Sequence, residues 1–152
     1  MQKLLATTSA TEWSAIIDNN LKSVFNCCQT AVPGMREKKW GRIINIGLVN
    51  ASRPQAFHSI TPYAIAKSAV VTFSRSLAVE TAPYGITVNV LLPGLMDNGT
   101  LSADEKKEMA VKIPARRLGT HHDLNAIINF LLGPRAAYIT GAEIAVSGGW
   151  GL

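Results

Sequence analysis

Three short apolar runs, each preceded by a long helical pattern, constrain the fold of this chain more than any other feature. The runs cover residues 42–46, 87–92 and 143–146, and their Val, Ile and Leu content is typical of strands buried on both faces. Apolar residues at helical spacing precede them over about residues 9–35, 62–82 and 124–132. Alternating helices and strands predict right-handed crossovers, and therefore an α/β fold with three parallel strands.

Helix-start signals support these boundaries. Three of them place a hydroxyl three residues before a carboxylate, a spacing that lets each group satisfy an N–H of the first turn. The pairs are Ser9 with Glu12, Ser102 with Glu105, and Thr120 with Asp123. A fourth start is predicted at Thr61, whose hydroxyl would cap a helix that has Pro62 at its first position.

The composition fits one globular domain that covers residues 1–152. The chain is 47% hydrophobic and 16% charged, and it contains no repeat, linker or low-complexity tract. No run approaches the roughly 20 apolar residues of a membrane helix. The first eight residues also make a poor secretory signal. We therefore expect a soluble, cytoplasmic protein without a membrane partner.

The formal net charge is +5, but the basic residues are scattered along the chain. Nucleic-acid binders usually carry a dense basic stripe or a recognisable module, so nucleic-acid binding is not expected. An anionic small ligand, such as a dinucleotide phosphate, would use the same surplus of positive charge.

A metal site is not expected either. His121 and His122 are neighbours at a helix start, where their side chains diverge, so they are interpreted as exposed residues beside a cap. The only cysteines, Cys27 and Cys28, are adjacent in a helix and cannot readily form a disulfide with each other. We interpret them as packing residues in a reducing compartment.

Tyr63 and Lys67 are the first candidates for chemistry. They lie four residues apart, so they share one face of the predicted helix. An ammonium beside a phenol favours the phenolate, and would lower the pKa of Tyr63 from its usual value of about 10. Such a pair suits proton transfer to a carbonyl oxygen or from an alcohol. Spacing alone favours the plainer interpretation of a packed tyrosine beside a solvated lysine.

The surrounding sequence changes this balance, because several stretches occur in the order and spacing of one family. They are residues 20–25 (NLKSVF), 41–47 (GRIINIG), 63–67 (YAIAK), 84–89 (YGITVN), 93–94 (PG), 117–120 (RLGT), 138–141 (YITG) and 146–149 (VSGG). On these motifs the chain resembles the short-chain dehydrogenases/reductases, particularly their 3-oxoacyl-acyl-carrier-protein reductases. The resemblance implies the C-terminal part of a Rossmann-like, doubly wound parallel sheet, with the N-terminal half missing.

The resemblance also implies roles for individual residues. Tyr63 would be the general acid/base, while Lys67 would lower its pKa and bind the ribose hydroxyls beside the nicotinamide. Asn20 matches the family's asparagine that holds a water in the proton relay. The turn of Pro93 and Gly94 would lie against the nicotinamide. The cofactor would be NADP or NAD, and the substrate a small carbonyl compound or alcohol.

Two positions depart from the family pattern. The family's catalytic serine, which hydrogen-bonds the substrate carbonyl, is replaced by Leu48, and losing such a donor lowers a rate about a hundred- to a thousandfold. The loop that follows is slightly longer than in the family, so Ser52 or Ser59 is an alternative donor. The threonine that binds the cofactor's carboxamide is replaced by Asn98, which can still donate and accept, with Thr100 as a second alternative.

The sequence lacks three features that would precede the first helix in the family. These are the glycine-rich phosphate loop, the residue that selects NAD or NADP, and the Asn-Asn-Ala-Gly stretch. About 100 residues of the sheet's first half are therefore absent. The strand at residues 42–46 is expected to have an open apolar edge, which invites pairing with another chain. Either the chain is a piece of a longer protein, or it is an independent product that has lost cofactor binding.

Two functions follow from these observations. The first is an NAD(P)-dependent oxidoreductase that reduces a carbonyl, with 3-oxoacyl thioesters among the candidate substrates, or that oxidises an alcohol. The alternative is a truncated, catalytically impaired remnant that acts only as a structural or oligomerising module. The resemblance implies a homo-oligomer through the helices that carry Asn20 and Tyr63. The sequence does not identify the substrate or choose between NAD and NADP, because residues 95–118 form the family's variable region and the cofactor-selecting residues are absent.

Overall fold

The computed structural model describes residues 4–51 and 56–151, and these residues contain three strands in one parallel sheet. β1 (Gly41–Ile46), β2 (Ile86–Pro93) and β3 (Glu143–Val146) lie in the order β1-β2-β3. The predicted parallel α/β sheet is confirmed, and no strand boundary differs from its prediction by more than one residue.

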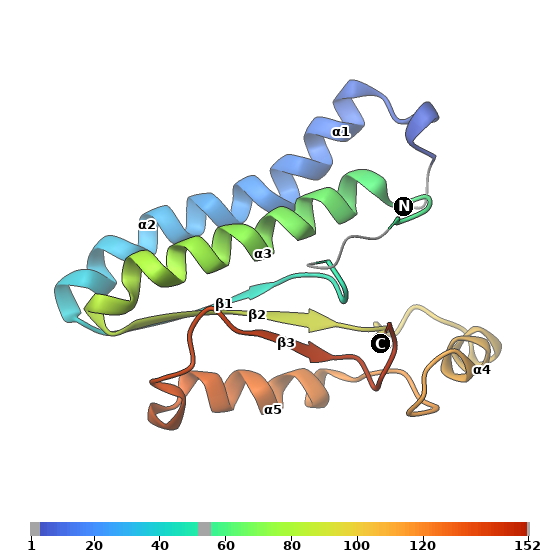
Figure 1. Cartoon of the computed structure of the whole chain (residues 1–152). Helices are drawn as coiled ribbons and strands as arrows, with labels where there is room; N and C mark the ends of the chain where they lie inside the picture. Colours follow the sequence, from blue (N-terminus) through green and yellow to red (C-terminus); the bar gives the residue numbers. More distant parts are fainter. Residues whose placement is uncertain (1–3, 52–55, 152) are drawn as a thin grey trace.

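Helices cover both faces of the sheet (Figure 1). α1 (Ala10–Ile17), α2 (Ser23–Lys38) and α3 (Thr61–Thr81) lie on one face, and α5 (His121–Leu132) lies on the other. α4 (Ala103–Val111) lies apart from these layers, beyond the carboxyl ends of the strands. Three short 3₁₀ turns occupy Leu5–Thr7, Ala82–Tyr84 and Pro134–Ala136. None of the described helices has the length and apolar character that crossing a membrane requires.

The predicted helix over residues 9–35 is one helical run with an irregular middle. A π-helical segment, Asp18–Lys22, joins α1 to α2, and α2 continues to Lys38 with Pro33 inside it. A π-segment of this kind inserts an extra residue into a helix, and such segments occur frequently at functional sites. Periodicity in the sequence gave no sign of it.

The predicted helix starts are largely confirmed. Ser9 and Ser102 accept hydrogen bonds from the backbone N–H groups of Glu12 and Glu105, whose carboxylates bond back to the serine N–H groups. At Thr120 the N–H and the hydroxyl both donate to the Asp123 carboxylate, at 2.7 and 2.8 Å, while the Asp123 N–H donates to the Thr120 carbonyl at 3.1 Å.

The cap predicted at Thr61 is wrong. Thr61 is the first helical residue of α3, the cap position belongs to Ile60, and the Thr61 hydroxyl donates to the Phe57 carbonyl at 3.3 Å. Pro62 is therefore the second helical residue and not the first, although it still lies in the first turn. The helix therefore begins one residue earlier than the sequence pattern indicated.

The core follows from the alternation of side chains along β1 and β2. One set faces α2 and α3, and the neighbouring residues face α5. The first cluster contains the buried residues Cys28, Ile43, Ala78, Ile86 and Val88. The second contains Leu91, Leu131 and Ala136, with Ile44 and Ile144 packed against them. Cys28 is thus a packing residue, as its sequence context predicted, whereas the same prediction is wrong for Cys27, which is exposed.

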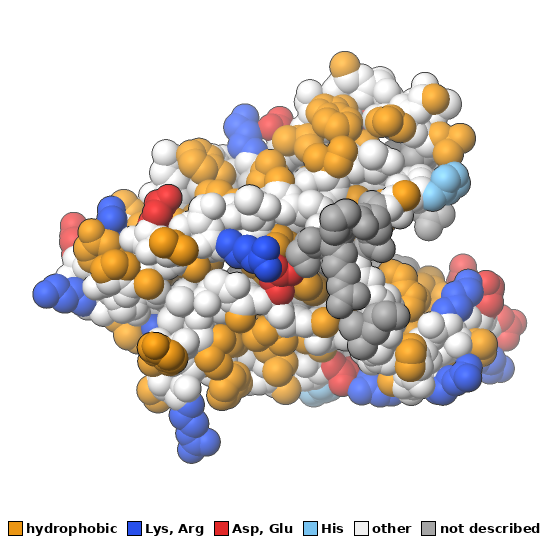
Figure 2. Space-filling view, viewed as in Figure 1, with side chains coloured by type: hydrophobic (Ala, Val, Ile, Leu, Met, Phe, Trp, Pro, Cys, Tyr) orange, Lys and Arg blue, Asp and Glu red, His pale blue; other side chains and the backbone are white. Residues whose placement is uncertain are grey.

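The edge of β1 that faces away from β2 has no strand partner within the described residues, as the sequence predicted. Ile46, the last residue of β1, is 40% exposed although it lies in an apolar strand. Phe130 and Leu132 of α5 are also exposed, and Figure 2 shows hydrophobic side chains gathered over the α5 side of the molecule. An open edge beside exposed apolar side chains is a surface that other polypeptide can cover.

Asn89 connects β2 to the segment that leads into β3. Its side chain is almost fully buried; Nδ2 donates to the Ile139 carbonyl at 2.8 Å, and Oδ1 accepts from the Ala142 N–H at 3.1 Å. Two backbone groups that the sheet leaves unpaired are therefore satisfied by one side chain.

Replacing Asn89 by Ala is expected to lower the free energy of unfolding by about 2–4 kcal/mol, because a buried carbonyl and a buried N–H both lose their partner. Urea denaturation followed by circular dichroism measures this change. Asn26→Ala on the exposed side of α2 serves as the control and is expected to change the value by less than about 0.5 kcal/mol. Equal effects of the two substitutions would contradict the role given to Asn89.

Candidate active site

Tyr63 and Lys67 lie in the first two turns of α3, at the end of the sheet where the strands finish (Figure 1). Lys67 Nζ donates to the carbonyl oxygen of Ile46, the last residue of β1, at 3.0 Å. The same Nζ atom lies 5.6 Å from the centroid of the Tyr63 ring. The predicted shared face is therefore present, and a hydrogen bond fixes it to the carboxyl end of β1.

Burial dominates the electrostatics of this pair. It raises the pKa of Tyr63 above its ordinary value of 10.0 and lowers the pKa of Lys67 below its ordinary value of 10.5. Both shifts have the same cause, since a partly buried group disfavours its charged form. The expected lowering of the Tyr63 pKa is therefore wrong for the chain in this structure: Lys67 lies over the ring, and its hydrogen bond goes to Ile46.

Asn20 lies in the π-helical segment. Its Nδ2 donates to the Ile16 carbonyl at 3.0 Å, and the neighbouring Ser23 hydroxyl donates to the Asn19 carbonyl at 2.7 Å. These two side chains satisfy carbonyls where the helical pattern is disturbed. The segment packs directly against α3. Asn20 is thus brought to the helix that carries Tyr63, by an irregularity that the sequence did not reveal.

The side chain of Leu48 has no hydrogen-bond donor that could stand in for the hydroxyl of the family's serine. This side chain is partly buried and packs against a cluster formed by Ala51, Val71, Val90 and Leu92. Ser59, one alternative donor, lies with its Oγ 2.7 Å from Nδ1 of the adjacent His58. The other alternative, Ser52, lies outside the described residues.

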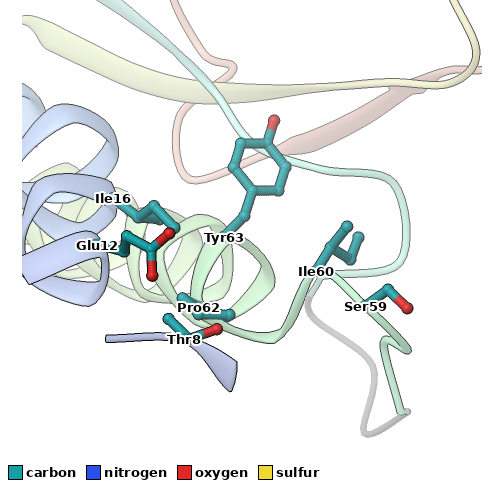
Figure 3. Close-up of a pocket in the computed structure, with 7 residues that line it drawn as sticks. All are labelled: Thr8, Glu12, Ile16, Ser59, Ile60, Pro62 and Tyr63. Carbon is teal, nitrogen blue, oxygen red and sulfur yellow. The ribbon is translucent and has the colours of Figure 1, made fainter. Parts of the chain in front are cut away.

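A small pocket lies beside Tyr63, with room for about one water molecule. Its lining comes from α1, from the start of α3 and from the segments that precede these two helices. The residues are Thr8, Glu12, Ile16, Ser59, Ile60, Pro62 and Tyr63. In Figure 3 the Tyr63 hydroxyl points away from both Glu12 and Ser59. The hydroxyl oxygen of Tyr63 therefore faces away from this pocket, and Ser59 is not placed as its hydrogen-bond partner.

The turn at the end of β2 is fixed by a close approach to β3. The Gly94 N–H donates to the Val146 carbonyl at 3.1 Å, and a Cβ on Gly94 would lie 2.7 Å from the Ser147 Cα. Only glycine fits against that backbone without a shift of one chain segment. The turn of Pro93 and Gly94 thus lies where two strands end side by side.

Asn98 lies in the loop after this turn. Its Oδ1 accepts hydrogen bonds from the Thr100 N–H at 3.1 Å and from the Thr100 hydroxyl at 2.7 Å. The two residues that the sequence offered as alternatives therefore contact each other. His121 and His122 begin α5 nearby, and no three His, Cys, Asp or Glu side chains of the described segments lie close enough together to hold a metal ion.

Comparisons with known proteins identify the family of this chain. A family model described as enoyl-(acyl carrier protein) reductase matches residues 1–151. The chain belongs to the short-chain dehydrogenase/reductase family. It corresponds to the C-terminal part of the family's fold, and it spans about 60% of the length of the curated relatives it matches.

Three similar proteins illustrate the range of this short-chain dehydrogenase/reductase family. The 3-oxoacyl-acyl-carrier-protein reductase FabG of Escherichia coli K12 is 39% identical over 149 residues, which are 96% of this chain and 60% of that protein. Nodulation protein G of Azospirillum brasilense is 36% identical over 150 residues, or 97% and 60% of the two chains. The crystal structure of acetoin dehydrogenase YohF from Salmonella typhimurium has a TM-score of 0.85 and 28% identity, and the match covers 99% of this chain and 60% of that one.

Alkaline titration of Tyr63 tests the electrostatics of this short-chain dehydrogenase/reductase site. The tyrosinate absorbance of the wild-type chain minus that of Tyr63→Phe is expected to show a midpoint above pH 10.0, since burial raises the Tyr63 pKa. The same difference for Tyr138→Phe gives the reference curve of a fully exposed tyrosine. A Tyr63 midpoint at or below pH 10.0 would show that Lys67 lowers the pKa and that burial does not govern it.

Proposed function

We propose that this chain carries the acid–base part of an NAD(P)-dependent oxidoreductase site that reduces a carbonyl group. The single observation that supports this most is the placement of Tyr63 and Lys67 at the carboxyl ends of parallel strands, with Lys67 hydrogen-bonded to the end of β1. Ligands bind at this end of open α/β sheets. Relatives named as 3-oxoacyl-acyl-carrier-protein reductases, 37–39% identical, favour a 3-oxoacyl thioester as the substrate.

In this proposal Tyr63, Lys67 and Asn20 each have a defined role. Tyr63 donates its phenolic proton to the substrate's carbonyl oxygen as the C=O bond becomes an alcohol, and the resulting phenolate is reprotonated from solvent. Lys67 stabilises that phenolate. Asn20 helps to hold the water through which the proton returns.

The residues fit one end of a nicotinamide dinucleotide. Lys67 is partly buried, and the described residues accept a hydrogen bond from one of its three N–H donors, so donors are left for ribose hydroxyls. Gly94 leaves the turn after β2 without a side chain, and Asn98 adds an amide four residues beyond Gly94. When bound, the nicotinamide supplies the hydride. The 152-residue sequence contains no glycine-rich loop leading into a helix for the pyrophosphate, so the fit concerns the nicotinamide end.

The protonation state of Tyr63 is compatible with proton donation to a carbonyl. Burial raises its pKa above the ordinary value of 10.0, so the phenol is neutral at neutral pH and can act as a proton donor.

The alternative is a catalytically impaired remnant that serves as a structural or oligomerising module. One observation favours it: Leu48 occupies the position of the family's catalytic serine, and its side chain packs into an apolar cluster. A homo-oligomer belongs to both hypotheses. Phe25 of α2 and Ile65 of α3 are exposed apolar residues on the helices that we propose as the subunit interface. We also propose a cytoplasmic location for the protein.

The proposal predicts that the purified chain oxidises NADPH or NADH in the presence of a 3-oxoacyl thioester, and that Tyr63→Phe lowers this rate about a hundred- to ten-thousandfold. Absorbance of the reduced nicotinamide measures the reaction. Tyr84→Phe, which alters an exposed ring far from the start of α3, is the control. A folded chain without Tyr63-dependent turnover would contradict the proposal and support the remnant.

Leu48→Ser is expected to raise the same rate about a hundred- to a thousandfold relative to Leu48→Ala, because it adds a hydroxyl donor beside the substrate's oxygen. Leu48→Ala is the matched control, since it removes the same packing against Val71 and Val90 without adding a donor. Equal rates for the two variants would show that position 48 does not contact the reacting carbonyl.

A further inference from the structure

α4 has no core of its own. None of its residues is buried, and its capping box at Ser102 and Glu105 stabilises the helix without fixing its place in the molecule. Charged side chains crowd the surface over this helix (Figure 2). Apolar burial holds the chain just after this helix, where Ile113 is almost fully buried, and along α4 itself polar contacts with the rest of the chain add to its placement.

The charged residues of α4 divide into two groups by their partners. Asp104 pairs with Lys107 at 3.9 Å, and Glu108 pairs with Lys112 at 2.9 Å, so both of these ion pairs stay within the helix or its cap. Lys106 alone among the described charges of α4 forms an ion pair outside that segment. Its Nζ lies 2.8 Å from Oδ2 of Asp97.

Asp97 is held on several sides. Its N–H donates to the Gly119 carbonyl at 2.8 Å, and its Oδ1 accepts from the Gly99 N–H at 2.9 Å. The hydrogen bond from Lys106 and the one from Gly99 lower the pKa of Asp97, and the nearby His121 adds to the effect. Lys106 and His121 are thus the basic groups that face this carboxylate. Asp97 therefore offers a fixed, ionised acceptor.

The position of Asp97 links α4 to the turn that ends β2. It follows Gly94 by three residues and directly precedes Asn98, whose carboxamide is tied to Thr100. A contact between Lys106 and Asp97 therefore joins α4 to the loop that we assigned to the cofactor's side of the site. The sequence did not reveal this pair, because eight residues of loop and helix lie between its two members.

We propose that Lys106 is a positioning residue, which through Asp97 fixes α4 to the loop of residues 97–100 so that the two segments move as one unit. The consequence for catalysis rests on the proposed function, because the loop matters only as a wall of that site. The coupling itself belongs to this chain's own structure. It needs neither cofactor nor substrate to be measured.

Hydrogen exchange followed by mass spectrometry tests the coupling on the full chain. Lys106→Met is expected to speed exchange about two- to fivefold both in α4 and in residues 97–100, the range of a partly exposed ion pair. Lys106→Arg keeps the charge and is expected to restore protection in both segments. Lys107→Met, which breaks only the pair with Asp104 inside the helix, is the matched control and is expected to leave residues 97–100 unchanged.

The outcomes separate this inference from the proposed function. Faster exchange confined to α4, or an equal response to Lys106→Met and Lys107→Met, would overturn the coupling even if Tyr63-dependent turnover is found. Faster exchange in both segments with rescue by Lys106→Arg supports it even if the chain shows no turnover. Asp97→Asn gives a second test of the charge, since Asn keeps an acceptor for the Gly99 N–H.

Discussion

The burial of β2 between helices on both faces is the constraint on which the rest of the structure depends. Every residue from Ile86 to Leu92 is buried, with side chains alternating between the α2–α3 layer and α5. This central position fixes β1 and β3 as its neighbours and brings their carboxyl ends together. α3 then starts at that same end, so Tyr63 and Lys67 lie beside the strand ends as a consequence of the packing.

Much of this could be predicted from sequence, for physical reasons. A strand buried on both faces is mostly apolar, so residues 87–92 stood out even though Thr87 and Asn89 lie among them. The capping residues Ser9 and Ser102 marked helix starts by chemistry that acts locally. Local signals fail where tertiary contacts decide. The π-segment around Asn20 packs against α3, which is distant in sequence, and no local pattern marks it. Thr61 has a hydroxyl that could cap a helix, but that hydroxyl donates to the Phe57 carbonyl.

The candidate site shows the same division. The spacing of Tyr63 and Lys67 predicted a shared face correctly, but it could not predict the direction of the Tyr63 pKa shift. That direction depends on how far the fold buries Tyr63 and on the hydrogen bond from Lys67 to the Ile46 carbonyl. A four-residue spacing in the sequence determines neither of these. The ion pair of Asp97 and Lys106 was likewise invisible, because it joins a loop to a helix that buries no residue.

The central claim is that the face of Tyr63 and Lys67 binds the nicotinamide end of a dinucleotide. Titration of the 152-residue chain with NADH and with NADPH, followed by nicotinamide fluorescence, tests it most directly. The account predicts saturable binding that Lys67→Met weakens by at least about tenfold, because donors to the ribose are lost. A folded chain that binds neither dinucleotide, or that binds one equally well with Lys67→Met, would contradict the account.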